Sequence, residues 1–235
     1  MTILRLTAVG LALLISSAAG AASLFVKPTT VILARGDAAA SVTLTNSGDV
    51  PVTAQVRVFG WEQSANEDRL TATSALAASP PMMTIPAGQS QTIRLVRTQQ
   101  AAAVNEESYR ILVDEINDRT AAAGAGVQMQ LRYSVPVFVM PKPNEPAQVA
   151  FTASLVADGL VIQAANQGKS HAQISNVSLR YADGSARVVN GGLVGYVLPA
   201  KARQWRLDLP TGVSAQTKAE SVRALVNGQE LIVKL

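Results

Sequence analysis

The residues from Val127 to Val139 alternate between apolar and polar side chains along most of their length. The apolar side chains occupy the odd positions, which are Val127, Met129, Leu131, Tyr133, Val135, Val137 and Val139. A period of two predicts a β-strand, because successive side chains of a strand point to opposite faces of its sheet. At roughly 3.3 Å per residue this strand would be roughly 40 Å long, about twice an ordinary strand. We therefore expect it to extend beyond the sheet to which it belongs.

Two interpretations of this long strand stay open. In the first, the apolar stripe is covered by the chain's own core, as in any long core strand. In the second, the part beyond the sheet keeps a stripe of Val, Met and Leu for a partner chain, which would pair with it by β-strand addition.

Short alternating segments separated by turns recur along the rest of the 235-residue chain. No segment combines helix caps with a sustained 3.6-residue period, so the pattern predicts an all-β protein. The length suits two β-sandwiches of roughly 100 residues each. Three prolines between Met140 and Pro146 predict a stiff linker. We therefore predict one domain at residues 22–141 and a second at residues 147–235, joined by a linker at residues 142–146.

Prolines, glycines and polar runs indicate how single segments behave. The opening strand, Ser23 to Leu33, is interrupted by Pro28, so it should lie at an edge or change partners. The run from Glu62 to Leu70 is polar and is interpreted as an excursion between strands. A short strand is expected from Gly195 to Leu198. Hairpin turns are predicted at Asp158-Gly159, Asp183-Gly184 and Asn227-Gly228.

Residues 1–21 have the pattern of a secretory signal peptide. Arg5 supplies a positive charge, Leu6 to Ile15 form a short apolar run, and Ala19-Gly20-Ala21 offers a cleavage site. The apolar run is too short to span a membrane comfortably, and no second run of spanning length follows. We expect an exported protein that starts at Ala22 or Ser23 and is not embedded in a membrane.

Charge and cysteine content exclude several classes of function. The formal net charge is +4, and it falls to +3 once Arg5 leaves with the signal peptide. The excess is scattered without a basic run, which argues against nucleic-acid binding and weakly favours a partner that bears carboxylates. The chain has no cysteine, so disulfides, thiol catalysis and thiolate metal sites are excluded.

The sequence contains no pattern of a catalytic or metal site. The single histidine, His171, lies in a polar turn, and we interpret it as a surface residue. Asp114 and Glu115 are neighbours on a strand, so their carboxylates point to opposite faces and cannot form an acid–base pair at one site. We expect them to serve in salt bridges or turns. We predict no enzyme activity, no catalytic residue, no metal and no cofactor.

An ordered set of segments covers nearly all of the chain after the signal peptide. It consists of Val31-Ile32-Leu33, Asn46 to Trp61, Pro80-Pro81, Ile85-Pro86-Ala87-Gly88, Ile93 to Arg97, Tyr109 to Ile116 and the long strand up to Pro141. Each segment alone is a weak signal. As an ordered set they resemble the periplasmic pilus-assembly chaperones of the chaperone–usher pathway, most strongly between Pro80 and Pro141.

The resemblance implies two immunoglobulin-like sandwiches in an L-shaped arrangement. Such chaperones bind pilus subunits, whose fold lacks its last strand, and cap them in the periplasm by inserting a long strand into the open groove. An outer-membrane usher then receives the subunit. The groove needs a cap because apolar side chains and unpaired strand edges aggregate. With its own stripe exposed, the free chaperone is expected to self-associate or to cover the stripe with residues 22–28.

Carried over residue by residue, the resemblance assigns the donated side chains to Val127, Met129 and Leu131, with Tyr133 or Val135 next. Each of these positions could also be ordinary core of the chain itself.

The chain departs from the family at the anchor for the subunit's C-terminal carboxylate. The family usually provides an Arg on the first strand and a Lys on the seventh, whereas Thr30 and Pro136 stand at those positions. In this respect the chain resembles the divergent, archaic branch of the family more than its main branch. The chain also departs from the family at an interdomain salt bridge, because Met140 stands where an Arg is usual.

A buried carboxylate still needs a cation, because an unpaired buried charge is costly. The candidates are Lys27, Arg94, Arg97, Arg110 and Arg132. We rank Arg94 and Arg132 first, because both are expected on strands next to the cleft.

Two other classes of protein compete with the chaperone. A structural pilus subunit or adhesin would carry an N-terminal donor extension and usually a disulfide. An exported carbohydrate-binding sandwich would need exposed aromatic platforms, for which only Trp61 and Trp205 are available as tryptophans.

Overall fold

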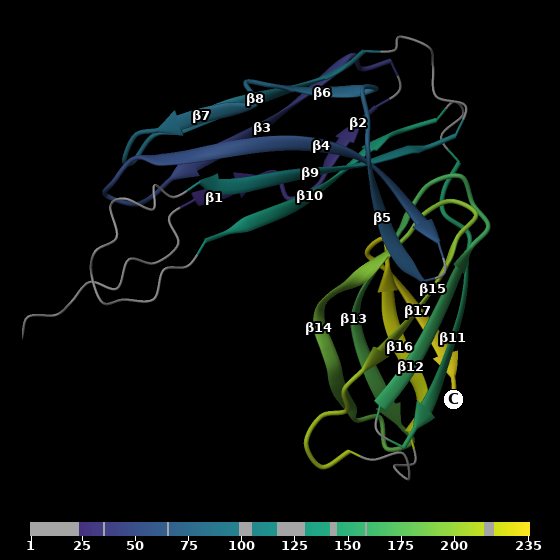
Figure 1. Ribbon diagram of the computed structural model, residues 1–235. Coiled ribbons are helices and arrows are strands. Elements are labelled where there is room, and N and C mark those ends of the chain that lie inside the picture. The colour runs from purple at the N-terminus through teal and green to yellow at the C-terminus, as the bar shows by residue number, and fades with distance from the viewer. Residues whose placement is uncertain are drawn as a thin grey trace, which may run out of the picture.

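The computed structural model describes residues 24–34, 36–64, 66–98, 105–116, 130–141, 145–157, 159–213 and 219–235. Within these ranges every regular element is a β-strand, as the sequence predicts. The strands form two sandwich domains that meet at an angle and give the molecule its L shape (Figure 1). The predicted signal peptide lies outside the described residues.

The first domain consists of two facing sheets. The outer sheet has the order β1-β3-β8-β6, formed by β1 (Leu24–Lys27), β3 (Ala39–Asn46), β8 (Ser90–Arg97) and β6 (Leu76–Ser79). The cleft sheet has the order β2-β10-β9-β4-β5, formed by β2 (Val31–Leu33), β10 (Arg132–Val139), β9 (Glu107–Ile116), β4 (Val52–Ser64) and β5 (Glu67–Ala72), and β7 (Met82–Ile85) pairs with β4.

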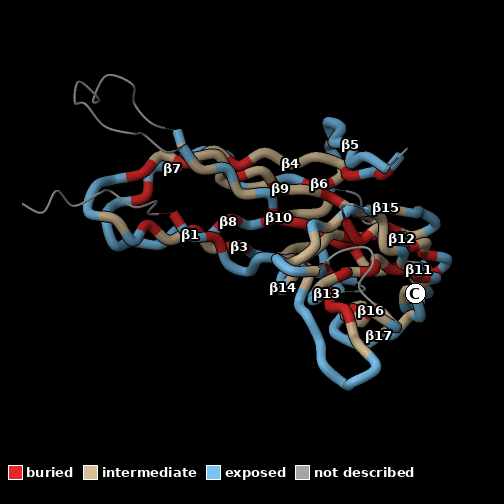
Figure 2. Tube along the Cα trace, turned by 90° about the horizontal axis from the view of Figure 1, so that it is seen from below, coloured by how far each residue is buried: buried red, intermediate tan, exposed pale blue. Residues whose placement is uncertain are grey.

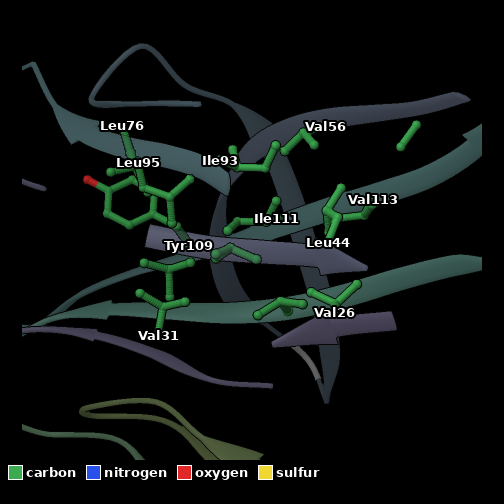
Figure 3. Close-up of a cluster of buried hydrophobic side chains, with 14 of the residues drawn as sticks. Val26, Val31, Leu44, Val56, Leu76, Ile93, Leu95, Tyr109, Ile111 and Val113 are labelled. Carbon is green, nitrogen blue, oxygen red and sulfur yellow. The ribbon is translucent and has the colours of Figure 1, made fainter. Parts of the chain in front are cut away.

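Alternating apolar residues of both sheets form the core of the first domain. Figure 3 shows Ile111 and Val113 of β9 in the same cluster as Ile93 and Leu95 of β8. All four side chains are at most 1% exposed. The period of two in these strands therefore decides which residues the two sheets bury between them.

Pro28 separates two strands that belong to different sheets. β1 pairs antiparallel with β3 in the outer sheet, whereas β2 pairs parallel with β10 in the cleft sheet. The prediction that the opening strand changes partners at this proline is confirmed. Because β2 is short, it covers only the last three residues of β10, Val137 to Val139.

The second domain also consists of two sheets. One has the order β11-β12-β15, formed by β11 (Val149–Val156), β12 (Gly159–Asn166) and β15 (Ala202–Leu207). The other has the order β14-β13-β16-β17, formed by β14 (Ala186–Val197), β13 (Ala172–Tyr181), β16 (Ala219–Val226) and β17 (Gln229–Lys234). Figure 2 shows buried stretches along strands of both domains and exposed stretches on their turns. The predicted linker, residues 142–146, falls between β10 and β11, and the exact domain boundaries stay a prediction.

Two predicted hairpin turns of the second domain are confirmed, at Asp183-Gly184 between β13 and β14 and at Asn227-Gly228 between β16 and β17. The third includes Asp158, which lies outside the described residues. Asn227 and Gly228, which join β16 to β17, both have positive φ angles, of 49° and 80°. That conformation suits the Asn-Gly pair. The strand expected at Gly195 to Leu198 is only the end of β14, which begins at Ala186. Its first half lacks apolar alternation because most of it is exposed at the edge of its sheet.

The polar run from Glu62 to Leu70 is not an excursion between strands, which corrects the prediction. It is the end of β4 and the start of β5, a hairpin arm that reaches to β15 of the second domain (Figure 1). Gln63 is only 2% exposed, and its amide donates to the Tyr196 carbonyl and accepts from the Leu198 N–H, both at 3.0 Å. The described strands of the two domains do not pair with each other across the junction. Polar side chains of this run, such as Gln63, form hydrogen bonds there instead, which explains why the run is polar.

The alternation predicted for the long strand ends at Ser134. All residues from Val135 to Val139 are buried, because the second domain covers the outward face at this end of β10. Phe138 shows this most clearly, since it is 0% exposed and packs in a cluster with Tyr196 and Leu198.

Candidate protein-binding cleft

The outward face of the cleft sheet lines the inner angle of the L. Residues that alternate with the core positions share this face. They are Gln55, Arg57 and Phe59 of β4, Arg110, Leu112 and Asp114 of β9, and Arg132, Ser134 and Pro136 of β10. The register places them in rows across the three strands, so this face carries several cations next to apolar side chains.

A cluster of aromatic rings from both domains closes the inner end of this face. Trp61 and Phe138 come from the first domain and Tyr196 from the second, and all three are at most 6% exposed. Their ring centroids lie 5.7–5.9 Å apart, within the range in which aromatic pairs stabilise each other. Met140 packs against this cluster. At Met140, where the resemblance led us to look for an interdomain salt bridge, the junction is therefore apolar.

Arg110 lies on top of this aromatic cluster. Its Cζ is 3.8 Å from the ring centroid of Trp61 and 5.5 Å from that of Tyr196. Burial lowers the pKa of Arg110 from its usual value, and the nearby Asp68 and Tyr196 partly oppose this effect. Arg110 forms no ion pair with any described residue. Its guanidinium nevertheless stays positively charged, because the pKa of an arginine remains far above neutral pH even when burial lowers it. The inner end of the cleft thus holds a partly dehydrated cation.

Thr30 and Pro136, the positions at which the resemblance predicted an anchor, are both linked to Arg110. Pro136 lies directly opposite Arg110 in the register of β10 and β9. The Thr30 hydroxyl lies 3.4 Å from the hydroxyl of Tyr196, whose ring is beside Arg110. A cation, Arg110, therefore lies on the strand next to Pro136.

At the other end of the face, Asp114 joins two arginines across three strands. Its carboxylate accepts from Arg57 at 2.7 Å and from Arg132. Burial alone would raise the pKa of Asp114, but the hydrogen bonds from Arg132 and Arg57 lower it below its usual range. The prediction of a structural salt bridge at Asp114 is confirmed. A depression of about 400 Å³ lies between this ladder and Leu131.

Replacing Asp114 with Asn should cost less than about 1 kcal/mol at neutral pH, because partly exposed ion pairs are worth 0.2–1 kcal/mol. Since the pKa of Asp114 is lower in the folded chain, its contribution is present above the pKa of the unfolded chain and is lost as the pH falls through the folded value. Urea unfolding of both chains at pH 7, 4 and 2 checks this. A deficit that is the same at all three values would contradict it.

The other three predicted anchor candidates lie away from this face. Arg94 is exposed on the outer sheet, opposite Ser41 and Ser79. Lys27 is exposed on β1 of the same sheet. Arg97 is largely buried and ion-paired with Glu107 at 3.1 Å. This placement argues against Arg94, which we ranked first together with Arg132. The sequence shows that Arg94 alternates with core residues, but it does not show to which of the two sheets its strand belongs.

The predicted donor residues divide into three groups. Val127 and Met129 lie outside the described residues. Leu131 is half-buried, and its carbonyl accepts from the N–H of Glu115 at 3.0 Å. Tyr133 packs on the first domain's core, where its hydroxyl donates to the Leu24 carbonyl. Val135 is 4% exposed inside that core, so its proposed donation to a partner is corrected.

One edge of β10 is open next to these residues. From Arg132 to Pro136 the strand pairs with β9 on one side, and no described strand lies on the other side, since β2 begins pairing at Val137. Unpaired backbone groups on such an edge can accept a strand from another chain. The open edge follows the predicted donor segment in the chain and ends at Pro136, which lies opposite Arg110 on the paired side of β10.

Residues 23–144, more than half of the chain, match the family model described as pili and flagellar-assembly chaperone, PapD N-terminal domain. The chain belongs to this chaperone family. The family is one of chaperones for the assembly of pili and flagella.

Solved structures of such chaperones have the same fold. A chain of the CsuC–CsuE chaperone–tip adhesion subunit complex from the archaic Csu pili of Acinetobacter baumannii is 22% identical, with a TM-score of 0.64, and covers 91% of this chain and 98% of its own. The SafA pilin–SafB chaperone complex of Salmonella enterica gives 16% identity, a TM-score of 0.61, and 91% and 96% coverage. The chaperone DraB of E. coli gives 18% identity, a TM-score of 0.60, and 91% and 98% coverage. A comparison with curated protein sequences found no significant match.

The tryptophans do not form a sugar-binding platform. Trp61 is 3% exposed inside the aromatic cluster, and Trp205 packs on the core of the second domain beside Gly195, where a Cβ would meet its ring at 2.9 Å. No group of three or more metal-ligating side chains occurs in the described part of the chain. Among the same residues no helix is long and apolar enough to cross a membrane.

Proposed function

We propose that this chaperone captures pilus subunits in the periplasm by donating the segment from Val127 to Leu131, and passes them to an outer-membrane usher. The observation that carries the proposal is the open edge of β10 from Arg132 to Pro136, which follows that segment in the chain and ends at the residue that pairs with Arg110. The complexes of CsuC with CsuE and of SafB with SafA, which share this fold, support a pilus subunit as the partner. The proposed role is binding without catalysis.

We further propose Arg110 as the anchor for the subunit's C-terminal carboxylate. It lies opposite Pro136 in the register of β9 and β10, and its aromatic support and partial dehydration strengthen a bond to an anion. Arg132 lies on the same face but already binds Asp114. The absence of the usual anchor pair, together with the likeness to an archaic chaperone complex, favours the archaic branch of the family.

The test begins with co-purification of the tagged chain from the periplasm and identification of the bound subunit. Replacing Arg110 with Ala should then weaken capture of that subunit about 10- to 150-fold, because a hydrogen bond to a charged group is worth about 1.5–3 kcal/mol. Arg94→Ala is the matched control, because Arg94 is an arginine on a strand of the same domain but faces away from the cleft.

Extending the subunit by two residues at its C-terminus should cause the same loss with the wild-type chaperone, because the carboxylate is displaced. If Arg110→Ala captures the subunit as well as wild type does, Arg110 is not the anchor. If no pilus subunit co-purifies at all, the proposed function itself is wrong.

A further inference from the structure

The side chain of Glu106 is fully buried at the domain junction, where it binds His171 of the second domain. Its two oxygens each lie 3.1 Å from the backbone nitrogen of His171, and Oε2 lies 2.8 Å from the ring Nδ1. A carboxylate only accepts hydrogen bonds, so Nδ1 carries a proton. One buried carboxylate therefore ties the start of β13 to the start of β9. His171 is not the surface residue that the sequence predicts, because its side chain is only 13% exposed.

Hydrogen bonds within the second domain also fix the main chain around His171. Asn227, in the turn between β16 and β17, donates from its amide to the His171 carbonyl at 3.2 Å. The N–H of Asn227 donates to the Gln173 carbonyl at 2.9 Å, and its side-chain oxygen accepts from the Gln173 N–H at 2.7 Å. His171 is thus held by Glu106 of the first domain and by Asn227 of the second, so its imidazole ring connects the two domains rigidly.

The ring of His171 stacks on Phe138 at the end of β10. The two centroids are 3.5 Å apart and the planes differ by 6°. Phe138 in turn lies 5.9 Å from Trp61, and Trp61 carries Arg110 at 3.8 Å. A continuous row of packed groups thus leads from the second domain to the cation of the cleft.

We propose that His171 is a positioning residue for subunit capture: its ring fixes Phe138 and Trp61, and these fix the guanidinium of Arg110. The proposal rests on the anchoring role proposed for Arg110. Protein interiors are close-packed, so removing the ring leaves a void beside Phe138 into which Phe138 and Trp61 can shift. His171 itself does not contact the subunit.

Two substitutions separate the contacts of His171. His171→Asn keeps a donor close to the place of Nδ1 and removes the ring, whereas His171→Phe keeps a ring and removes the donor. The chain has two tryptophans, so labelling with 5-fluorotryptophan gives two ¹⁹F signals, and Trp205→Phe assigns them. Trp205 packs on the core of the second domain and is an internal control.

We expect His171→Asn to move the Trp61 signal, leave the Trp205 signal in place, and weaken capture of the co-purified subunit about tenfold, the loss that follows when a charge-assisted bond is misplaced. His171→Phe should keep the Trp61 signal and lower the melting temperature, because the Glu106 carboxylate loses a donor. The effects of His171→Asn and Arg110→Ala on capture should not add, because both act on the same bond.

An unchanged Trp61 signal and unchanged capture in the folded His171→Asn chain would overturn the proposal and leave His171 a purely structural residue. A Trp61 signal that moves in His171→Phe but not in His171→Asn would equally overturn it, since the ring would not be the positioning contact. Additive effects with Arg110→Ala would show that His171 does not act through Arg110. If Arg110→Ala alone is neutral, Arg110 is not the anchor and His171 cannot position it for capture, so both proposals fail while the co-purified subunit still supports the proposed function.

Discussion

Replacing Met129 and Leu131 together with Asp should abolish capture of pilus subunits while the free chain keeps its melting temperature. Burying one such apolar side chain is worth roughly 1.5–3 kcal/mol, so two lost contacts weaken binding by more than roughly 100-fold. Two charges placed in an apolar groove without partners add a further penalty. Single truncations should only weaken capture, because main-chain bonds of a donated strand do not depend on its side chains. The measurements are subunit recovery from the periplasm and thermal unfolding of the purified chain.

Val135→Asp is the matched control for this double variant. Val135 belongs to the same predicted stripe, but it is 4% exposed inside the core of the first domain. An unpaired charge at this position should destabilise the free chain by about 3–5 kcal/mol. A large drop in melting temperature for the Met129 and Leu131 variant would show that the stripe belongs to the chain's own core. A stable double variant that still captures subunits would remove this segment from the mechanism.

Replacing Gln63 with Ala should uncouple the two domains. Gln63 pairs with the Tyr196 carbonyl and the Leu198 N–H at a position with 2% exposure, so its loss leaves two buried main-chain groups without partners. Each such group costs about 1–3 kcal/mol. We expect calorimetry to show two separate unfolding transitions in Gln63→Ala, where the wild-type chain unfolds in one.

The neighbouring Glu62→Ala is the control for Gln63→Ala, because Glu62 is exposed on the same strand. It should unfold as the wild-type chain does. A single transition at the wild-type temperature in Gln63→Ala would mean that the aromatic cluster alone couples the domains.

The periodicity of the sequence determined the elements of this fold. Alternation along segments such as Tyr109 to Ile116 marks a strand and the face that it buries, and this information is local to a few residues. Pro28 and the Asn227-Gly228 pair marked a change of partner and a hairpin turn, since each has few backbone conformations open to it. The ordered set of segments was enough to indicate the family, although the donor residues Val127 and Met129 stay predictions.

Only the tertiary structure decided which polar residues matter in the cleft. Arg94 and Arg110 both alternate with core positions on strands, and nothing local tells that one faces away and the other rests on Trp61. Likewise, Gln63 and His171 lie in polar stretches whose partners are more than 60 residues away in the chain. Alternation gives the side of a strand on which a residue lies. Whether that side meets solvent, a second sheet or another domain depends on how distant segments pack, and this packing is set by the whole chain.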